Sequence, residues 1–116
     1  MANLGALQAI TEFLVAWKNQ DWQKVLDYCQ ISWVDASPDP MEELKILLGY
    51  KLVEIGMIDL IPVSDVASRG KIKIEYNIAR GVSKKAEIEP MIICETAPLT
   101  PDIKGKWGVN PISIGI

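Results

Sequence analysis

The sequence predicts an α+β protein in which N-terminal helices pack on an antiparallel sheet. In the first half of the chain, apolar residues recur every three or four positions, which is typical of amphipathic helices. From Tyr50 onward they recur at every second position, which is typical of strands with one buried face. The 116 residues contain no linker, internal repeat or low-complexity stretch. We therefore expect a single domain over residues 1–116.

Two helices are predicted at the start of the chain, over residues 4–19 and 22–30. The apolar residues of the first helix fall on one stripe, formed by Leu7, Ile10, Phe13, Leu14 and Trp17. Asp21 is a favourable N-cap for the second helix, because its carboxylate can accept a hydrogen bond from a free backbone N–H. The pair is expected to form a helical hairpin with a tight joint.

A turn and a third helix are predicted next. Residues 31–40 contain Pro38 and Pro40, and the residue before a proline is pushed away from the helical region. The third helix is expected over residues 41–49, with Asp39 as its cap and Gly49 as its stop.

About four strands are predicted after these helices, arranged as a meander. Residues 70–78 alternate cleanly between isoleucine or tyrosine and polar side chains. The other strands are expected over residues 53–66, 86–96 and 107–114, with connections over 80–85 and 97–106. Gly56 and Pro62 indicate a bulge, a bend or a sheet edge in the first strand.

Composition excludes several classes of function. The net charge is −3, and the 12 basic residues are scattered, so we expect no nucleic-acid binding. The sequence has no apolar run of about 18 residues that would span a membrane, and no basic leader, so a cytoplasmic protein is expected. The chain has no histidine, which removes imidazole chemistry and histidine metal ligands. Cys29 and Cys94 are interpreted as reduced thiols among apolar neighbours, and neither a metal nor a cofactor is expected.

The order of these segments resembles the nuclear transport factor 2-like superfamily, also called cystatin-like. The resemblance rests on the Asp21–Trp22 joint of the helical hairpin and on a last strand that begins Gly105, Lys106, Trp107, x, Val109. It covers essentially the whole chain. It implies a strongly curved, cone-shaped sheet whose open end often holds a small molecule.

The function implied by this resemblance is a non-catalytic domain that binds a small apolar molecule or a peptide in an apolar cone. The residues expected to line that cone are Phe13, Trp17, Trp33, Asp35, Tyr50, Tyr76 and Trp107. The alternative is an enzyme of the isomerase, dehydratase or cyclase kind that uses Asp or Tyr in the cone. No catalytic residue is assigned, because no sequence feature indicates a carboxylate with a raised pKa.

A second alternative is a structural dimerisation module. The expected strand over residues 107–114 would place Ile112 and Ile114 on its outer face, where water would contact them in a monomer. Met91 and Ile93 are expected on the same convex face of the sheet. Because relatives of this superfamily often pair through their sheets, we expect a homodimer whose interface includes Met91, Ile93, Ile112 and Ile114.

Overall fold

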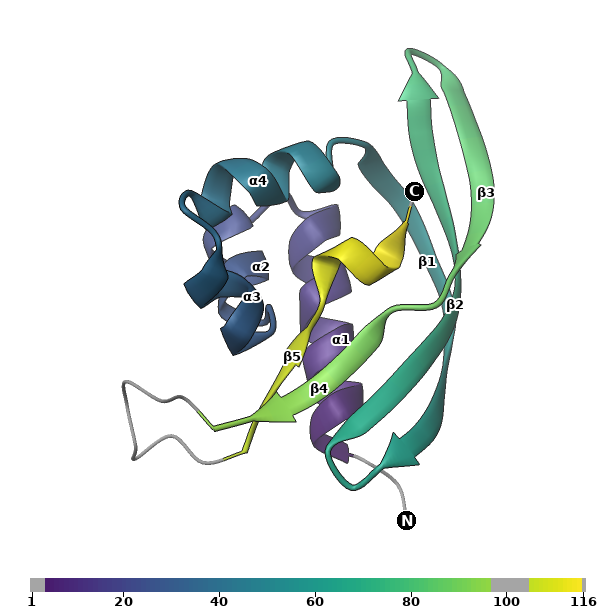
Figure 1. Ribbon diagram of the computed structural model, residues 1–116. Coiled ribbons are helices and arrows are strands. Elements are labelled where there is room, and N and C mark those ends of the chain that lie inside the picture. The colour runs from purple at the N-terminus through teal and green to yellow at the C-terminus, as the bar shows by residue number, and fades with distance from the viewer. Residues whose placement is uncertain (1–3, 97–104, 116) are drawn as a thin grey trace.

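The protein is described by a computed structural model that covers residues 4–96 and 105–115. Over these residues the chain is α+β, as predicted. Four α-helices come first, and they are followed by an open, five-stranded antiparallel sheet and a short 3-10 helix (Figure 1). The helices lie to one side of the sheet, and the tip of the β2–β3 hairpin extends beyond them (Figure 1).

The helical hairpin is confirmed as α1 (Leu4–Lys18) and α2 (Trp22–Asp27). Asp21 caps α2, since its Oδ1 accepts a hydrogen bond from the Lys24 backbone N–H at 3.4 Å. The second helix ends three residues earlier than predicted. The backbone after it pairs with the last strand instead, and the Gln30 N–H donates to the Val109 carbonyl at 2.9 Å.

Residues 31–36 are helical, which corrects the prediction of a turn. They form α3 (Ile31–Ala36), which places Trp33 in the core. Pro38 does push the residue before it out of the helical region, but only Ser37 is affected, so the helix continues up to Ala36. The helix predicted next is present as α4 (Pro40–Leu47), and Asp39 caps it through a hydrogen bond from the Glu42 N–H at 3.2 Å.

The sheet is built around β2 (Ala67–Ala79). It pairs on one side with β1 (Lys51–Ser64), and on the other side with both β3 (Val82–Ile88) and β4 (Met91–Glu95). β4 pairs in turn with β5 (Lys106–Val109). The predicted strand over residues 86–96 is therefore divided at Glu89–Pro90, where proline has no N–H for the ladder.

The connection predicted over residues 80–85 is wrong, because β3 already begins at Val82. Gly81 has a positive φ of 73°, a conformation that glycine adopts readily, and it makes a tight turn between Ala79 and Val82. The first part of β3 is exposed on both faces. It therefore lacks the alternation of apolar and polar residues that identifies a half-buried strand in a sequence.

The strand predicted over residues 107–114 is also wrong beyond Val109. Residues Pro111–Ile114 form a 3-10 helix, η1, in which Asn110 Oδ1 accepts a hydrogen bond from the Ile112 N–H at 3.0 Å. Ile112 is consequently 59% exposed, whereas Ile114 is 4% exposed and belongs to the core. These two residues do not share an outer strand face, and Ile116 lies outside the described residues.

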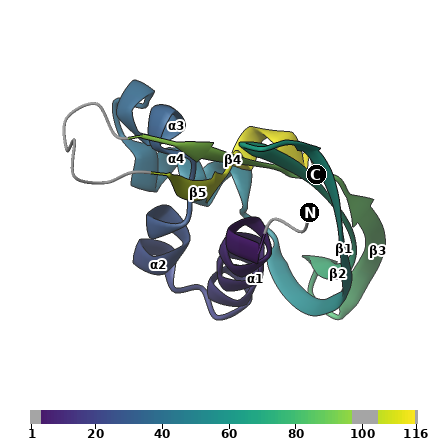
Figure 2. The same ribbon diagram turned by 90° about the horizontal axis from the view of Figure 1, so that it is seen from below.

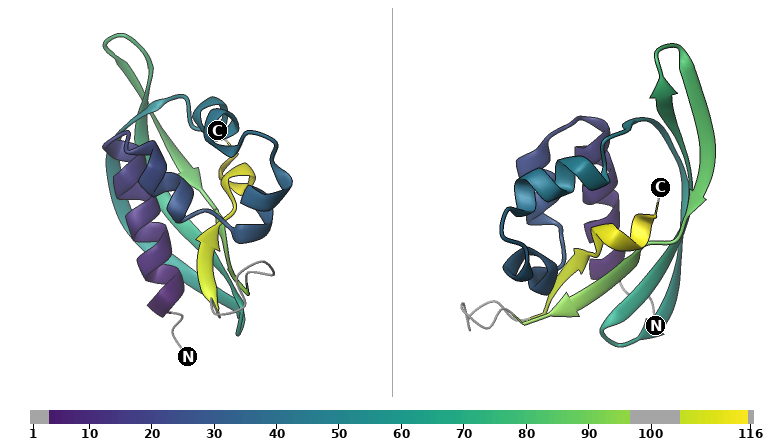
Figure 3. Two further views of the ribbon diagram at one scale, coloured as in Figure 1. Left: turned by 90° about the vertical axis from the view of Figure 1, so that its left-hand side faces the viewer. Right: turned by 45° about the horizontal axis from the view of Figure 1, so that its top comes forward.

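The hydrophobic core lies where α1 packs along one face of the sheet (Figures 2 and 3). Leu7 is an exception to the predicted stripe, because it is half-exposed, whereas the side chains of Ile10, Phe13, Leu14 and Trp17 are fully buried.

Two glycines allow β5 to lie close to the helical part of the chain: Gly5 of α1 and Gly108 of β5. A Cβ atom on Gly5 would lie 2.3 Å from Cδ1 of Trp107, and one on Gly108 would lie 2.5 Å from the Cys29 carbonyl oxygen.

Candidate functional site

Three of the residues predicted to line a cone lie close together at one end of the core. The indole Nε1–H of Trp17 donates a hydrogen bond to the backbone carbonyl of Tyr50 at 3.1 Å. The Tyr50 ring lies over the Tyr76 ring, with 5.1 Å between the centroids and 46° between the planes. Tyr76 is buried, while Tyr50 is 42% exposed and is the member of this group that water contacts most.

The remaining aromatic candidates take part in packing. Phe13 and Trp17 have no exposed surface, and Trp33 is buried in the same core. Trp107 is partly buried and lies against Gly5 of α1. The pocket over β1, β2 and β3 and the pocket beside α3 are lined by other side chains. These four aromatic residues therefore act in the structure as core residues.

Asp35 lies apart from the tyrosines, on the exposed side of α3. It lines a surface pocket of about 580 Å³ together with Ser32 and Glu95, and neither Tyr50 nor Tyr76 lines that pocket. Sequence reasoning did not place Glu95 here, because it lies 60 residues after Asp35 along the chain.

Glu95 connects α3 to β4 through a group of hydrogen bonds. Its Oε2 accepts from the Ser32 N–H at 2.9 Å, and its Oε1 accepts from the Ser32 hydroxyl at 2.8 Å and from the Gln30 side-chain amide. Desolvation raises the pKa of the Glu95 carboxyl, but the hydrogen bonds from Gln30 and Ser32 stabilise the charged form and leave the pKa below its usual value. These contacts hold two elements together and leave Glu95 occupied by the protein itself.

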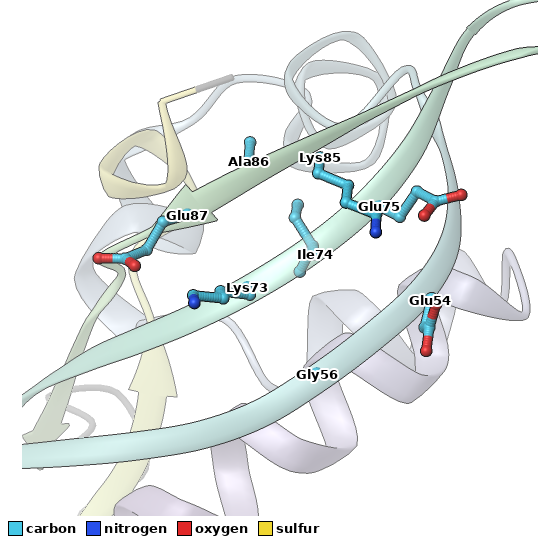
Figure 4. A pocket seen from close by; sticks show the side chains of 8 residues that line it. All are labelled: Glu54, Gly56, Lys73, Ile74, Glu75, Lys85, Ala86 and Glu87. Carbon is cyan, nitrogen blue, oxygen red and sulfur yellow. The ribbon is translucent and has the colours of Figure 1, made fainter.

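The outer face of the sheet, opposite α1, carries the best candidate for a binding site. Two adjoining pockets of about 410 and 490 Å³ lie over β1, β2 and β3, and both include Lys73 and Glu87. Figure 4 shows charged side chains of these three strands around the first pocket. We call the two pockets together the outer groove. Its charged residues are Glu54, Asp59, Lys71, Lys73, Glu75, Lys85 and Glu87.

Strand register explains why opposite charges alternate in the outer groove. Residues directly opposite on antiparallel strands share a face. Asp59 lies opposite Lys71, and Lys73 lies opposite Glu87. Lys71 and Glu87 form an ion pair, with 3.8 Å between Nζ and Oε1. The groove thus presents both signs of charge at short spacing.

A β-bulge forms the floor of the outer groove, at the glycine that the sequence marks as a bulge or bend. Ile55 pairs with Ile74 and Ile58 with Ile72, so Gly56 and Met57 together lie opposite the single residue Lys73. A Cβ atom on Gly56 would lie 2.9 Å from the Lys73 carbonyl oxygen, so the absence of a side chain lets the bulged backbone of β1 lie close against β2 here. Met57, next to it, is 80% exposed.

The residues predicted at a dimer interface lie in different surroundings. Ile93 lies opposite Ala67 and Met91 opposite Arg69, which places both on the outer face, partly buried.

Among the described residues, no group of Cys, Asp and Glu side chains is arranged to hold a metal ion. Within the same part of the chain, no helix combines the length and the hydropathy needed to cross a bilayer.

No protein-family model matches the sequence, and no curated protein is significantly similar to it. The arguments about function therefore depend on the geometry of this chain alone.

Proposed function

We propose that this chain is a non-catalytic binding module that pairs with a second copy of itself through the outer face of the sheet. The observation that supports this most directly is the position of large apolar side chains that water contacts. Five of them lie on β1 or in the turn after it: Val53, Met57, Ile61, Val63 and Val66. Covering such side chains with a partner is favourable, because it removes their apolar surface from water.

Contact through the face of the sheet is favoured over extension of its edge. Among the described residues, β1 lies at an edge of the sheet, and an edge strand can pair with a strand of another chain. However, β1 carries Pro62 and the bulge at Gly56–Met57, and both are features that hinder the addition of another strand. A partner would then lie over the outer face, where Met91 and Ile93 are also found.

The two alternatives that need an interior site have less support. A ligand beside α1 would need space next to Phe13 and Trp17, whose side chains are fully buried. An enzyme of the expected kind would combine a carboxylate with a tyrosine hydroxyl, but the pocket that Asp35 lines includes neither Tyr50 nor Tyr76. We therefore place the binding function on the surface.

Membership of the nuclear transport factor 2-like superfamily remains part of this proposal. It is supported by the α2 cap at Asp21, the order of helices before strands, and β5 at Lys106–Val109. A crystal structure in which β1–β5 bend around α1 into a cone would support this membership, and a flat sheet would contradict it.

Sedimentation velocity from micromolar to submillimolar concentration tests the pairing. We expect a concentration-dependent shift from monomer to dimer. Native mass spectrometry of freshly purified protein tests the interior alternative in parallel, because a retained small molecule would add mass to each chain. A monomer at every concentration would overturn the proposal.

A further inference from the structure

The tip of the β2–β3 hairpin has a charge opposite to that of the whole chain, whose net charge is −3. Residues 77–85 contain no acidic side chain and three basic ones: Arg80, Lys84 and Lys85. Among the described residues, no ion pair involves any of these three. Lys85 lies opposite Glu75, whereas Lys84 lies opposite Tyr76 and Arg80 occupies the turn. The tip therefore has positive charge that is available to a partner.

Two aliphatic side chains at the same tip are in contact with water. Ile78 and Val82 lie on either side of the Arg80–Gly81 turn, and each is 48% exposed. The tip extends beyond the helices (Figures 1 and 3), which leaves both side chains half in water. The hairpin thus presents apolar and cationic groups together at its end.

The directions of the two lysines favour a partner that meets the hairpin end-on. Successive residues of a strand point to opposite faces of the sheet. Lys84 is therefore on the face of the buried Tyr76, and Lys85 is on the outer face with Glu75. A partner lying on one face would reach one of the two lysines. A broad surface that the tip enters is within reach of both.

An anionic lipid surface supplies both chemistries at suitable depths. Shallowly inserted groups reach about 5–10 Å into the boundary between headgroups and acyl chains. Lys84 and Lys85 follow Val82 by two and three residues, which is about 7–10 Å along a strand. The lysines can then stay at the phosphates while the aliphatic side chains go deeper, and the long Arg80 side chain can extend back to the same level. Nucleic acid offers phosphates but no apolar layer.

We infer that the tip of the β2–β3 hairpin binds the surface of an anionic membrane. Its aliphatic side chains enter the acyl boundary, and its three basic side chains meet lipid phosphates. The protein lies on the membrane and does not span it. This inference goes beyond the proposed pairing and does not depend on it, because Arg80, Lys84 and the two aliphatic residues do not line the outer groove.

Co-sedimentation of the full chain with lipid vesicles tests this inference. We expect binding to vesicles of phosphatidylcholine with about 30% phosphatidylserine, and at least about tenfold weaker binding to vesicles of phosphatidylcholine alone. Raising the salt concentration from about 0.1 to about 0.5 M should also weaken binding, because salt screens the charges.

The double variant Arg80→Ala/Lys84→Ala assigns the binding to the hairpin. Each cation near an anionic surface strengthens binding about fivefold, so the double variant should bind at least about tenfold more weakly. The matched control is Lys18→Ala/Lys45→Ala, which removes the same charge from exposed positions of α1 and α4. Thermal unfolding followed by circular dichroism checks that each variant is folded.

A second pair of variants tests the aliphatic contact. Val82→Asp should weaken vesicle binding at least about tenfold, because it places a carboxylate in the acyl boundary and among the phosphates. Ile46→Asp, on α4, makes the same change at a side chain that is 73% exposed and should leave binding nearly unchanged.

Four outcomes would overturn this inference: no binding to the anionic vesicles, equal binding to both kinds of vesicle, equal weakening by a variant and its control, or tighter binding to polyglutamate or duplex DNA than to the vesicles. The last would make an acidic macromolecule the partner. Sedimentation velocity of Arg80→Ala/Lys84→Ala separates this inference from the proposed pairing, because the variant should dimerise like the wild-type chain.

Discussion

The packing of Gly108 gives the sharpest prediction for stability. Replacing it with alanine would place a Cβ atom 2.5 Å from the Cys29 carbonyl oxygen, 2.7 Å from the Cys29 carbonyl carbon and 2.7 Å from Cα of Gln30. All three are backbone atoms, so no side-chain rotation relieves the overlap. β5 and the segment after α2 would have to move apart.

The expected cost has two parts. Inserting a methyl group into a packed site costs about 1–3 kcal/mol. Separation would also weaken two hydrogen bonds, from the Gln30 N–H to the Val109 carbonyl at 2.9 Å and from the Val109 N–H to the Tyr28 carbonyl at 2.8 Å. Each contributes about 0.5–1.5 kcal/mol. The Gly108→Ala variant should therefore lose about 2–6 kcal/mol of the free energy of unfolding.

Urea unfolding followed by circular dichroism measures this loss, and thermal unfolding should show a fall in Tm of at least about 8 °C. The matched control is Gly49→Ala, where the nearest atoms to the new Cβ would be carbonyl oxygens at 3.4 and 3.5 Å, an ordinary contact distance. Neither glycine has a positive φ, so the comparison isolates the steric effect. A free energy of unfolding for Gly108→Ala within about 1 kcal/mol of that for Gly49→Ala would refute the reasoning.

Three further predictions concern the Glu95 carboxylate, the thiols of the two cysteines and the Trp17 indole. Glu95→Gln should destabilise the fold by about 1–2 kcal/mol at neutral pH. Because the pKa of Glu95 is lowered in the folded state, urea titrations at several pH values should show this difference from wild type shrinking as the pH falls below about 4.5 and through the folded pKa. Burial raises the pKa of Cys29 to about 12, so iodoacetamide should label Cys94 first in the native protein, and peptide mass spectrometry that finds Cys29 labelled first would contradict its burial. Trp17→Phe should lower the free energy of unfolding by about 2 kcal/mol, because the Tyr50 carbonyl loses its donor; an unchanged urea midpoint would show that this hydrogen bond contributes little.

The elements predicted well are those with one buried face and one exposed face. In α1 and β2 burial recurs at a regular spacing, and apolar residues recur at the same spacing in the sequence. α3 was missed because the prolines that follow it suggested a turn over the whole segment. The strand beyond Val109 was predicted wrongly because Ile112 and Ile114 alternate, although the Asn110 cap and Pro111 begin a 3-10 helix.

The candidate site was harder to predict, for a different reason. An aromatic residue that lines a cavity and one that fills the core have the same pattern in a sequence, so Phe13 and Trp17 fitted either role. The outer groove depends on cross-strand register, which places Lys73 opposite Glu87. The bulge at Gly56 was indicated, but its effect on Met57 depends on pairing with β2, which the sequence does not specify.

The contact between Gly5 and Trp107 has a consequence for synthesis of the protein. It joins α1 to β5, which is synthesised after the other four strands of the described sheet. Until β5 emerges, the apolar stripe of α1 has no strand to cover that part of it, and a nascent chain in this state exposes surface that chaperones recognise. Emergence of β5 from the ribosome, more than any earlier step, should therefore set the moment at which this part of the chain becomes resistant to proteases.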